Sequence, residues 1–242
     1  MEKEDLKKLL IITLFATAMG FLEAVVVVYL RELYYPGGFT FPLQMMTEKI
    51  YLTEIIREAS TLVMLLTVGI LAGKTAWERF GWFLFSFAVW DILYYVALKV
   101  LLNWPESLLT WDILFLIPVV WVGPVLAPVI SSLLMIFLCL MILHLKKKGF
   151  RHGYNLKAWL VLGTGALLTF ISYVIDYTRI LFQTPLHEDS GSILNNQALI
   201  EAVSRYVPER FAWEWHIAGS ILIVASMLLH YSRHAREKKN AS

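Results

Sequence analysis

Six apolar segments divide this chain of 242 residues. Each is long enough to cross the hydrocarbon core of a bilayer as a helix, which takes about 20 residues. The chain is 58% hydrophobic with a mean hydropathy of +0.64, well above a soluble domain. We therefore predict an all-α, polytopic membrane bundle that forms a single domain over 1–242, with spans near Leu9–Leu30, Tyr51–Ala72, Trp77–Leu101, Gly123–His144, Lys157–Phe182 and Phe211–Tyr231.

The distribution of Lys and Arg predicts the topology. If the N-terminus is cytoplasmic, 14 of the 21 basic residues fall on the inner side and 7 on the outer side. Because cytoplasmic segments carry the excess of positive charge, both termini are predicted inside, in the plasma (cytoplasmic) membrane, with 232–242 as a basic cytoplasmic tail. The apolar stretch Leu9–Leu30 is too long for a cleaved signal peptide, so we expect a retained first helix.

Two segments on the predicted outer side differ from the long apolar spans. The stretch 106–118 is apolar but short, and Pro118, Pro124 and Pro128 argue against one continuous helix. We expect a re-entrant or interfacial segment here, with a short helix that roofs a cavity. The outer loop 183–210 carries apolar residues near one helical face over 193–207, which predicts an amphipathic surface helix.

Ionisable residues lie inside the apolar segments, where a charge costs roughly 2.5 kcal/mol or more at a helix centre. At 1.5 Å per residue, most of them fall about 5–10 Å below the outer boundary of the bilayer. Because several helices contribute at one depth, we predict a shared polar site that faces the outside or periplasm. The residues are Glu23, Glu54, Glu58, Asp91, Asp112, Asp176, Arg179, Glu214 and His216.

The leading hypothesis is a metal-dependent, hydrolase-like membrane enzyme that acts on a lipid or another apolar substrate. Carboxylates and an imidazole are ligands that helical bundles use for Zn, Fe or Mn, and a bound metal activates water. Four helices would each supply one ligand, and a spare carboxylate would act as general base. The predicted ligands are Glu23, Glu58, Asp91 and His216, and the predicted bases are Glu54 and Asp112.

Two other functions stay open. The same acids would serve a proton- or cation-coupled transporter as its coupling site. In a non-catalytic subunit or assembly factor they would be neutralised by ion pairs, within the chain, in an oligomer or with partner subunits. Spacing at i,i+3 predicts such pairs for Asp176 with Arg179 and for Glu54 with Arg57. The net charge of +2 gives no indication of nucleic-acid binding.

The remaining histidines give weaker evidence for a functional site. His230 and His234 are spaced i,i+4, but they neighbour a basic tail, so we expect solvated residues at the inner interface. A bis-histidine haem site between His144 and His230 is a weaker alternative for the same reason. The single Cys139 leaves no intramolecular disulfide.

Overall fold

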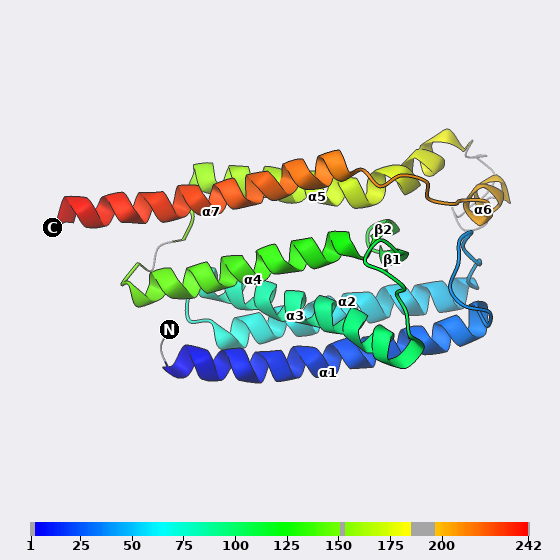
Figure 1. Ribbon diagram of the computed structural model, residues 1–242, viewed down its shortest axis with the longest axis horizontal. Coiled ribbons are helices and arrows are strands. Elements are labelled where there is room, and N and C mark those ends of the chain that lie inside the picture. The colour runs from blue at the N-terminus through cyan, green and yellow to red at the C-terminus, as the bar shows by residue number, and fades with distance from the viewer. Residues whose placement is uncertain (1–2, 151–152, 185–196, 242) are drawn as a thin grey trace.

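Six long helices form the bundle, as predicted, and run roughly along one common axis (Figure 1). The computed structural model describes residues 3–150, 153–184 and 197–241. Both ends of the chain lie at the same end of the bundle, as an even number of spans requires (Figure 1). The helices are α1 (Lys3–Tyr34), α2 (Glu48–Ala72), α3 (Ala76–Leu102), α4 (Leu126–Lys147), α5 (Leu156–Gln183) and α7 (Trp213–Ala241).

Local capping sets the helix ends. The side chains of Thr47, Thr75 and Asn155 accept hydrogen bonds from the third residue of α2, α3 and α5, which satisfies a free backbone N–H in each first turn. Asn103 takes the left-handed conformation (φ 53°) that ends α3. Most helix ends extend beyond the predicted spans, because polar flanking residues continue the helical turns that apolar length alone does not reveal. The starts of α4 and α7 instead lie three and two residues inside the predicted spans.

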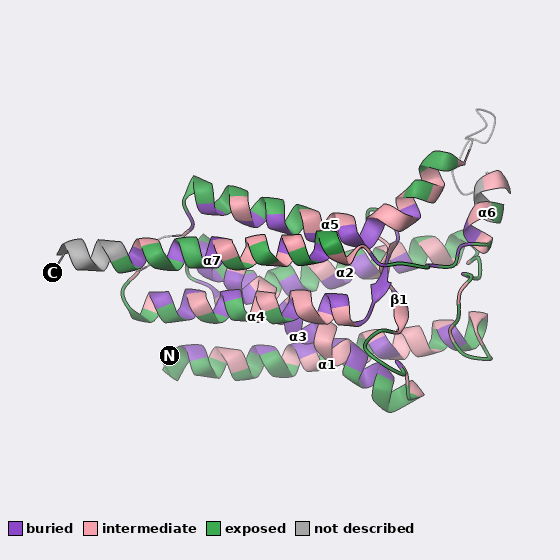
Figure 2. Cartoon of the chain, turned by 45° about the horizontal axis from the view of Figure 1, so that its top comes forward, coloured by how far each residue is buried: buried purple, intermediate pink, exposed green. Residues whose placement is uncertain are grey.

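Helix α3 is the centre of the larger half of the bundle, where α1, α2 and α4 all pack against it. Its buried positions surround the helix rather than following one stripe (Figure 2). The smaller half is the α5–α7 pair, which α4 and β2 (Trp121–Pro124) join to the rest. Glycines permit the closest approaches: a Cβ on Gly20 of α1 would lie 2.9 Å from the backbone oxygen of Trp90 on α3.

A two-stranded antiparallel hairpin lies between α3 and α4, formed by β1 (Trp111–Phe115) and β2 (Trp121–Pro124). The short helix predicted over 106–118 is therefore wrong. Both strands are rich in aromatic and β-branched residues, which favour extended backbone, and Pro118 and Pro124 have no N–H for a helical ladder. The backbone N–H groups of Val125 and Leu126 bond to Thr110 and Leu108, which closes the base of the hairpin.

The outer loop contains one described helix, α6 (Gln197–Ser204), at the end of the bundle opposite the termini (Figure 1). It is shorter than the helix predicted over 193–207, and 185–196 lie outside the described residues. Just after α6, Tyr206 contacts the ring of Phe41 and donates a hydrogen bond to Asp176 at 2.8 Å. These contacts tie the last outer loop to the first outer loop and to α5.

Candidate functional site

A cavity of about 560 Å³ lies between α1, α2, α3 and the hairpin. The first outer loop also lines it, so the cavity lies in the half of the bundle away from the termini. Five of the carboxylates predicted to share a site line this one cavity, from three helices and β1. They are Glu23, Glu54, Glu58, Asp91 and Asp112.

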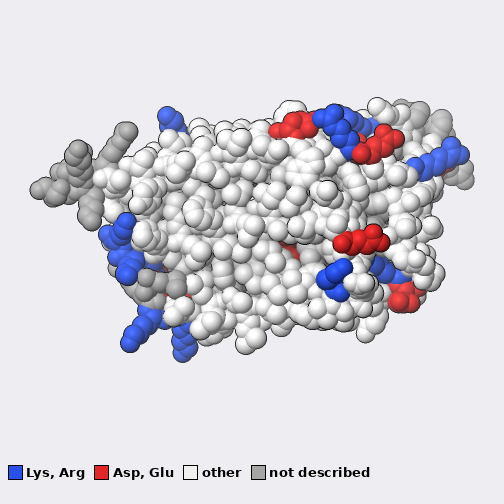
Figure 3. All heavy atoms as spheres, in the orientation of Figure 1, with Lys and Arg blue, Asp and Glu red and all other residues white. Residues whose placement is uncertain are grey.

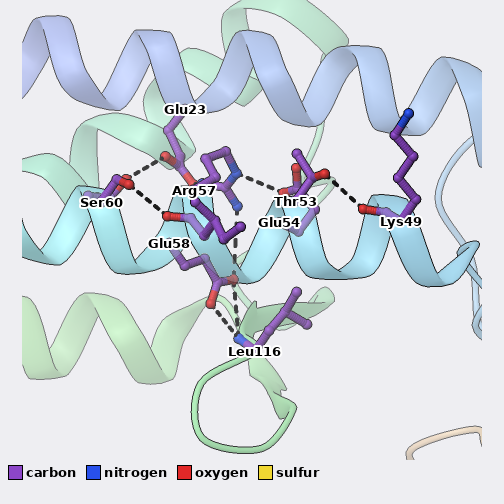
Figure 4. Close-up of polar contacts among 10 residues, drawn as sticks. Glu23, Lys49, Thr53, Glu54, Arg57, Glu58, Ser60 and Leu116 are labelled. Atoms are coloured by element: carbon purple, nitrogen blue, oxygen red, sulfur yellow. Dashed lines mark hydrogen bonds and ion pairs between the residues drawn. The ribbon is translucent and has the colours of Figure 1, made fainter. Parts of the chain in front are cut away.

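Arg57 on α2 is the centre of an ion-pair cluster in this cavity (Figure 4). Its Nε lies 2.7 Å from Glu54 Oε2, which confirms the pair predicted from i,i+3 spacing. Its other nitrogens reach Glu23 across to α1, through an ion pair, and Glu58 at 3.9 Å. One guanidinium therefore faces three carboxylates, so the cluster contains two more acidic groups than basic groups.

Glu58 joins α2 to the hairpin. Its Oε2 and Oε1 accept from the backbone N–H of Leu116, at 2.9 Å and 3.2 Å (Figure 4). Leu116 immediately follows β1, and Glu58 lies ten residues after the start of α2, about 15 Å along the helix axis. The turn of the hairpin thus folds back alongside α2 instead of ending at the rim of the bundle.

Arg31 and Asp112 form a second ion pair, with Arg31 Nη2 3.4 Å from Asp112 Oδ1. Only 8% and 2% of the two residues are exposed. The guanidinium carbon also lies 3.7 Å from the ring centroid of Trp104, which adds a cation–π contact.

Asp91 on α3 differs from the other acids. Its Oδ2 accepts a hydrogen bond from Ser132 Oγ on α4 at 2.8 Å, and no Lys or Arg of the described residues pairs with it. The next turn of α3 presents Tyr94 and Tyr95 to the same cavity. Of the five predicted acids in the cavity, Asp91 is therefore the one that no ion pair among the described residues holds.

The structure places the remaining predicted residues elsewhere. His216 lies between α5 and α7, with Nδ1 3.3 Å from Ser172 Oγ, and does not line the cavity. Glu214 pairs with Arg210 at 3.4 Å on the surface. The predicted pair of Asp176 with Arg179 is not among the contacts of the described residues, because Asp176 bonds to Tyr206 instead.

Three of the four predicted metal ligands, Glu23, Glu58 and Asp91, line the cavity, but each is held by a different partner. Among the described residues, no three His, Cys, Asp or Glu side chains are grouped as a metal site needs. The physical reason is that each residue has another partner. Glu23 forms an ion pair with Arg57, Glu58 accepts a hydrogen bond from the backbone N–H of Leu116, and Asp91 accepts one from Ser132. His216 packs in the other half of the bundle. The described positions of these four side chains therefore do not fit a metal site.

His230 and His234 are buried, each about 1% exposed, so the expectation of solvated residues is wrong. Their ring centroids lie 4.5 Å apart, and the segment after α4 covers them with Phe150 and Tyr154. His144 is exposed, which gives no support to a haem held between His144 and His230. These rings pack the end of the smaller half-bundle that lies near the C-terminus.

Sequence reasoning missed the contacts that cross between helices. Arg31 and Arg57 are essential to the cavity, yet their partners Asp112 and Glu23 lie 81 and 34 positions away in the sequence. Opposite charges at a similar depth were the available signal, because an unpaired charge at that depth is costly. Depth alone does not show which helices are neighbours.

Comparison with known proteins adds no relative: no protein-family model matches the chain, and neither curated proteins nor solved structures give a match. Function is therefore argued from the cavity itself.

Proposed function

We propose that the protein is a membrane-embedded enzyme that binds a lipid or another amphiphile in this cavity and transforms it by carboxylate acid–base chemistry. The observation that carries the proposal is the convergence of five acids and two arginines on one cavity with aromatic and apolar walls. Cavities of this size with a few convergent polar groups are typical of small-molecule sites. Ion pairing alone would not require an open volume around the charges.

The cavity is proposed to face the outside, with the termini in the cytoplasm. Lys and Arg side chains dominate the terminal end of the face shown in Figure 3, whereas acidic and basic groups are mixed at the opposite end. This distribution supports a cytoplasmic location for the terminal end. In that orientation the turn of the hairpin is re-entrant, since it lies beside Glu58 inside the bundle.

Asp91 is the proposed general acid–base. A group in this role must exchange its proton with substrate, and Asp91 is held by a single hydroxyl rather than by an ion pair. Glu54 and Asp112, the bases predicted from sequence, are committed to Arg57 and Arg31. We assign them to holding the two guanidinium groups in place, and Glu58 to fixing the hairpin over the cavity.

Substrate is proposed to reach the cavity sideways, between α1 and α2. Both helices pack along α3 and contact each other much less. The Glu23–Arg57 pair bridges them, and these side chains remain 12% and 21% exposed on a surface that would face lipid. A polar bridge between two apolar helices is a suitable lateral portal for an amphiphile.

One observation favours a second candidate, the cation- or proton-coupled transporter. The terminal end of the bundle is closed by Lys146, which lies 2.9 Å from Asp5 and 3.6 Å from Glu78 and so ties together α4, α1 and α3. An outward-facing transporter needs such a breakable closure below its binding site. The transporter would open this cluster, and the enzyme would keep it closed.

Asp91→Asn separates these functions. Wild-type protein in liposomes made from host membrane lipids is expected to convert at least one lipid species, detected by untargeted mass spectrometry. Asp91→Asn should lower that conversion by about a hundredfold or more, the loss typical of a general acid–base. Glu201→Gln, in a surface pair with Arg205, is the control and should retain full activity.

Equal lipid profiles with wild type and Asp91→Asn would contradict the enzyme. If wild-type liposomes then showed a proton or cation flux that Asp91→Asn removed, the transporter would replace it.

A further inference from the structure

We infer that the ligand of this cavity carries a positively charged amine or quaternary ammonium group next to an apolar portion. The inference rests on the proposed function in that it assigns a substrate class to the same cavity. Its first basis is charge balance. Six carboxylates and two arginines of the described residues line the cavity, because Glu48 joins the five acids at the rim, so the formal charge is +2 − 6 = −4.

Both arginines are already occupied. Arg57 faces Glu23, Glu54 and Glu58, and Arg31 is held by Asp112 and by the ring of Trp104. An anionic head group would have to displace one of these carboxylates from a poorly solvated site and leave it without a partner, which is unfavourable. Binding of an anionic ligand in this cavity is therefore unfavourable.

A buried carboxylate oxygen without a partner in the described part of the chain lies in the wall of the cavity. Asp112 is 2% exposed, and its Oδ2 has no hydrogen-bond partner among the described residues, although its Oδ1 pairs with Arg31. Asp91, which lines the same cavity, has no cationic partner among the described residues. Among the described residues only Arg31 pairs with either acid, so a positively charged head group would balance the second carboxylate.

The walls favour an organic cation over a metal ion. Tyr94, Tyr95 and Trp90 line the cavity beside Asp91, and aromatic faces attract ammonium groups. Apolar residues, including Val27, Leu114 and Val120, complete the lining. Since no three acids of the described residues are grouped for a metal, the chemistry fits a head group of amine type on an apolar chain.

Three eight-carbon probes test the inference: octyltrimethylammonium, octanoate and octyl glucoside. They share one chain length and differ in the charge of the head group. Equilibrium dialysis of purified protein, below the critical micelle concentration of each probe, gives their affinities. We expect octyltrimethylammonium to bind at least tenfold more tightly than the other two.

Variants locate the effect. Asp91→Asn and Asp112→Asn should each weaken cation binding about fivefold or more. Glu48→Gln, at the exposed rim, should weaken it about twofold through charge alone. Glu201→Gln should leave it unchanged. If Asp91→Asn or Asp112→Asn does not fold, Glu48→Gln still provides the test.

The possible results separate the inference from the proposed function. Equal affinity for all three probes, abolished when Val120→Trp fills the cavity, would overturn the cationic ligand and keep the amphiphile site. Preference for octanoate would also overturn it. Saturable binding of none of the probes would contradict both. If Asp91→Asn, Asp112→Asn and Glu48→Gln all leave the affinity for octyltrimethylammonium unchanged, the cation binds elsewhere and the inference is overturned.

Discussion

Replacing Arg57 with methionine is expected to lower the free energy of unfolding by about 3–5 kcal/mol. The substitution keeps the apolar stem and removes the charge that faces Glu23, Glu54 and Glu58. Three carboxylates would then face one another in a poorly solvated cavity, and α1 would lose its ion pair to α2. Thermal unfolding in a neutral detergent measures the loss.

The comparison variants make this result specific. Arg205→Met removes a charge from the exposed pair with Glu201 and should change stability by less than about 1 kcal/mol. Adding Glu23→Gln and Glu54→Gln to Arg57→Met should restore a large part of the loss, because fewer charges then lack a partner. If Arg57→Met is as stable as Arg205→Met, the cluster does not hold these helices together.

Gly20→Leu is expected to force α1 away from α3 and to cost about 3 kcal/mol or more, at or above the upper end of overpacking effects. An added Cβ at Gly20 would lie 2.9 Å from both Trp90 O and Tyr94 N, which are backbone atoms that cannot rotate away. Because Trp90 and Tyr94 flank Asp91, the same shift would enlarge the cavity and displace its central acid. Unfolding and probe binding should both deteriorate.

Gly163→Leu is the matched control on α5. A Cβ at Gly163 would meet no atom within 4 Å among the described residues, so the larger side chain would extend toward lipid. Replacing a helical glycine there should be neutral or stabilise by up to about 1 kcal/mol. Equal effects at Gly20 and Gly163 would show that the contact between α1 and α3 does not position the cavity.

The sequence predicts the helices well because one physical requirement, an apolar stretch of about 20 residues, governs them all. It also predicts that Glu23, Glu54, Glu58, Asp91 and Asp112 share a site. Glu23, Glu54 and Glu58 have similar depths from their positions along the spans, Asp91 lies deeper, and Asp112 belongs to the segment expected to roof the site. The cavity brings these five together. Position along a helix is therefore a good guide to which charges can meet.

The errors concern neighbours and orientation. His216 has the predicted depth, but α7 pairs with α5 rather than with α1, α2 or α3. The segment before Pro118 is apolar, and short apolar runs do not distinguish a helix from a strand, so the hairpin was not foreseen. The predicted site changes accordingly, from carboxylates with an imidazole to carboxylates with arginines.

The most direct test of the account is the charge selectivity of a cysteine inside the cavity. Val119 lines the cavity, Val207 is exposed in the outer loop, and Cys139 is the only native cysteine. In Cys139→Ala protein, we compare Val119→Cys with Val207→Cys in intact cells, using a membrane-impermeant trimethylammonium thiosulfonate and its sulfonate counterpart. We expect both cysteines to react from outside. The ratio of the cationic to the anionic reaction rate should be about tenfold or more higher at position 119 than at position 207. Equal ratios at the two positions, or reaction at 119 only after the cells are permeabilised, would contradict an acidic cavity open to the exterior.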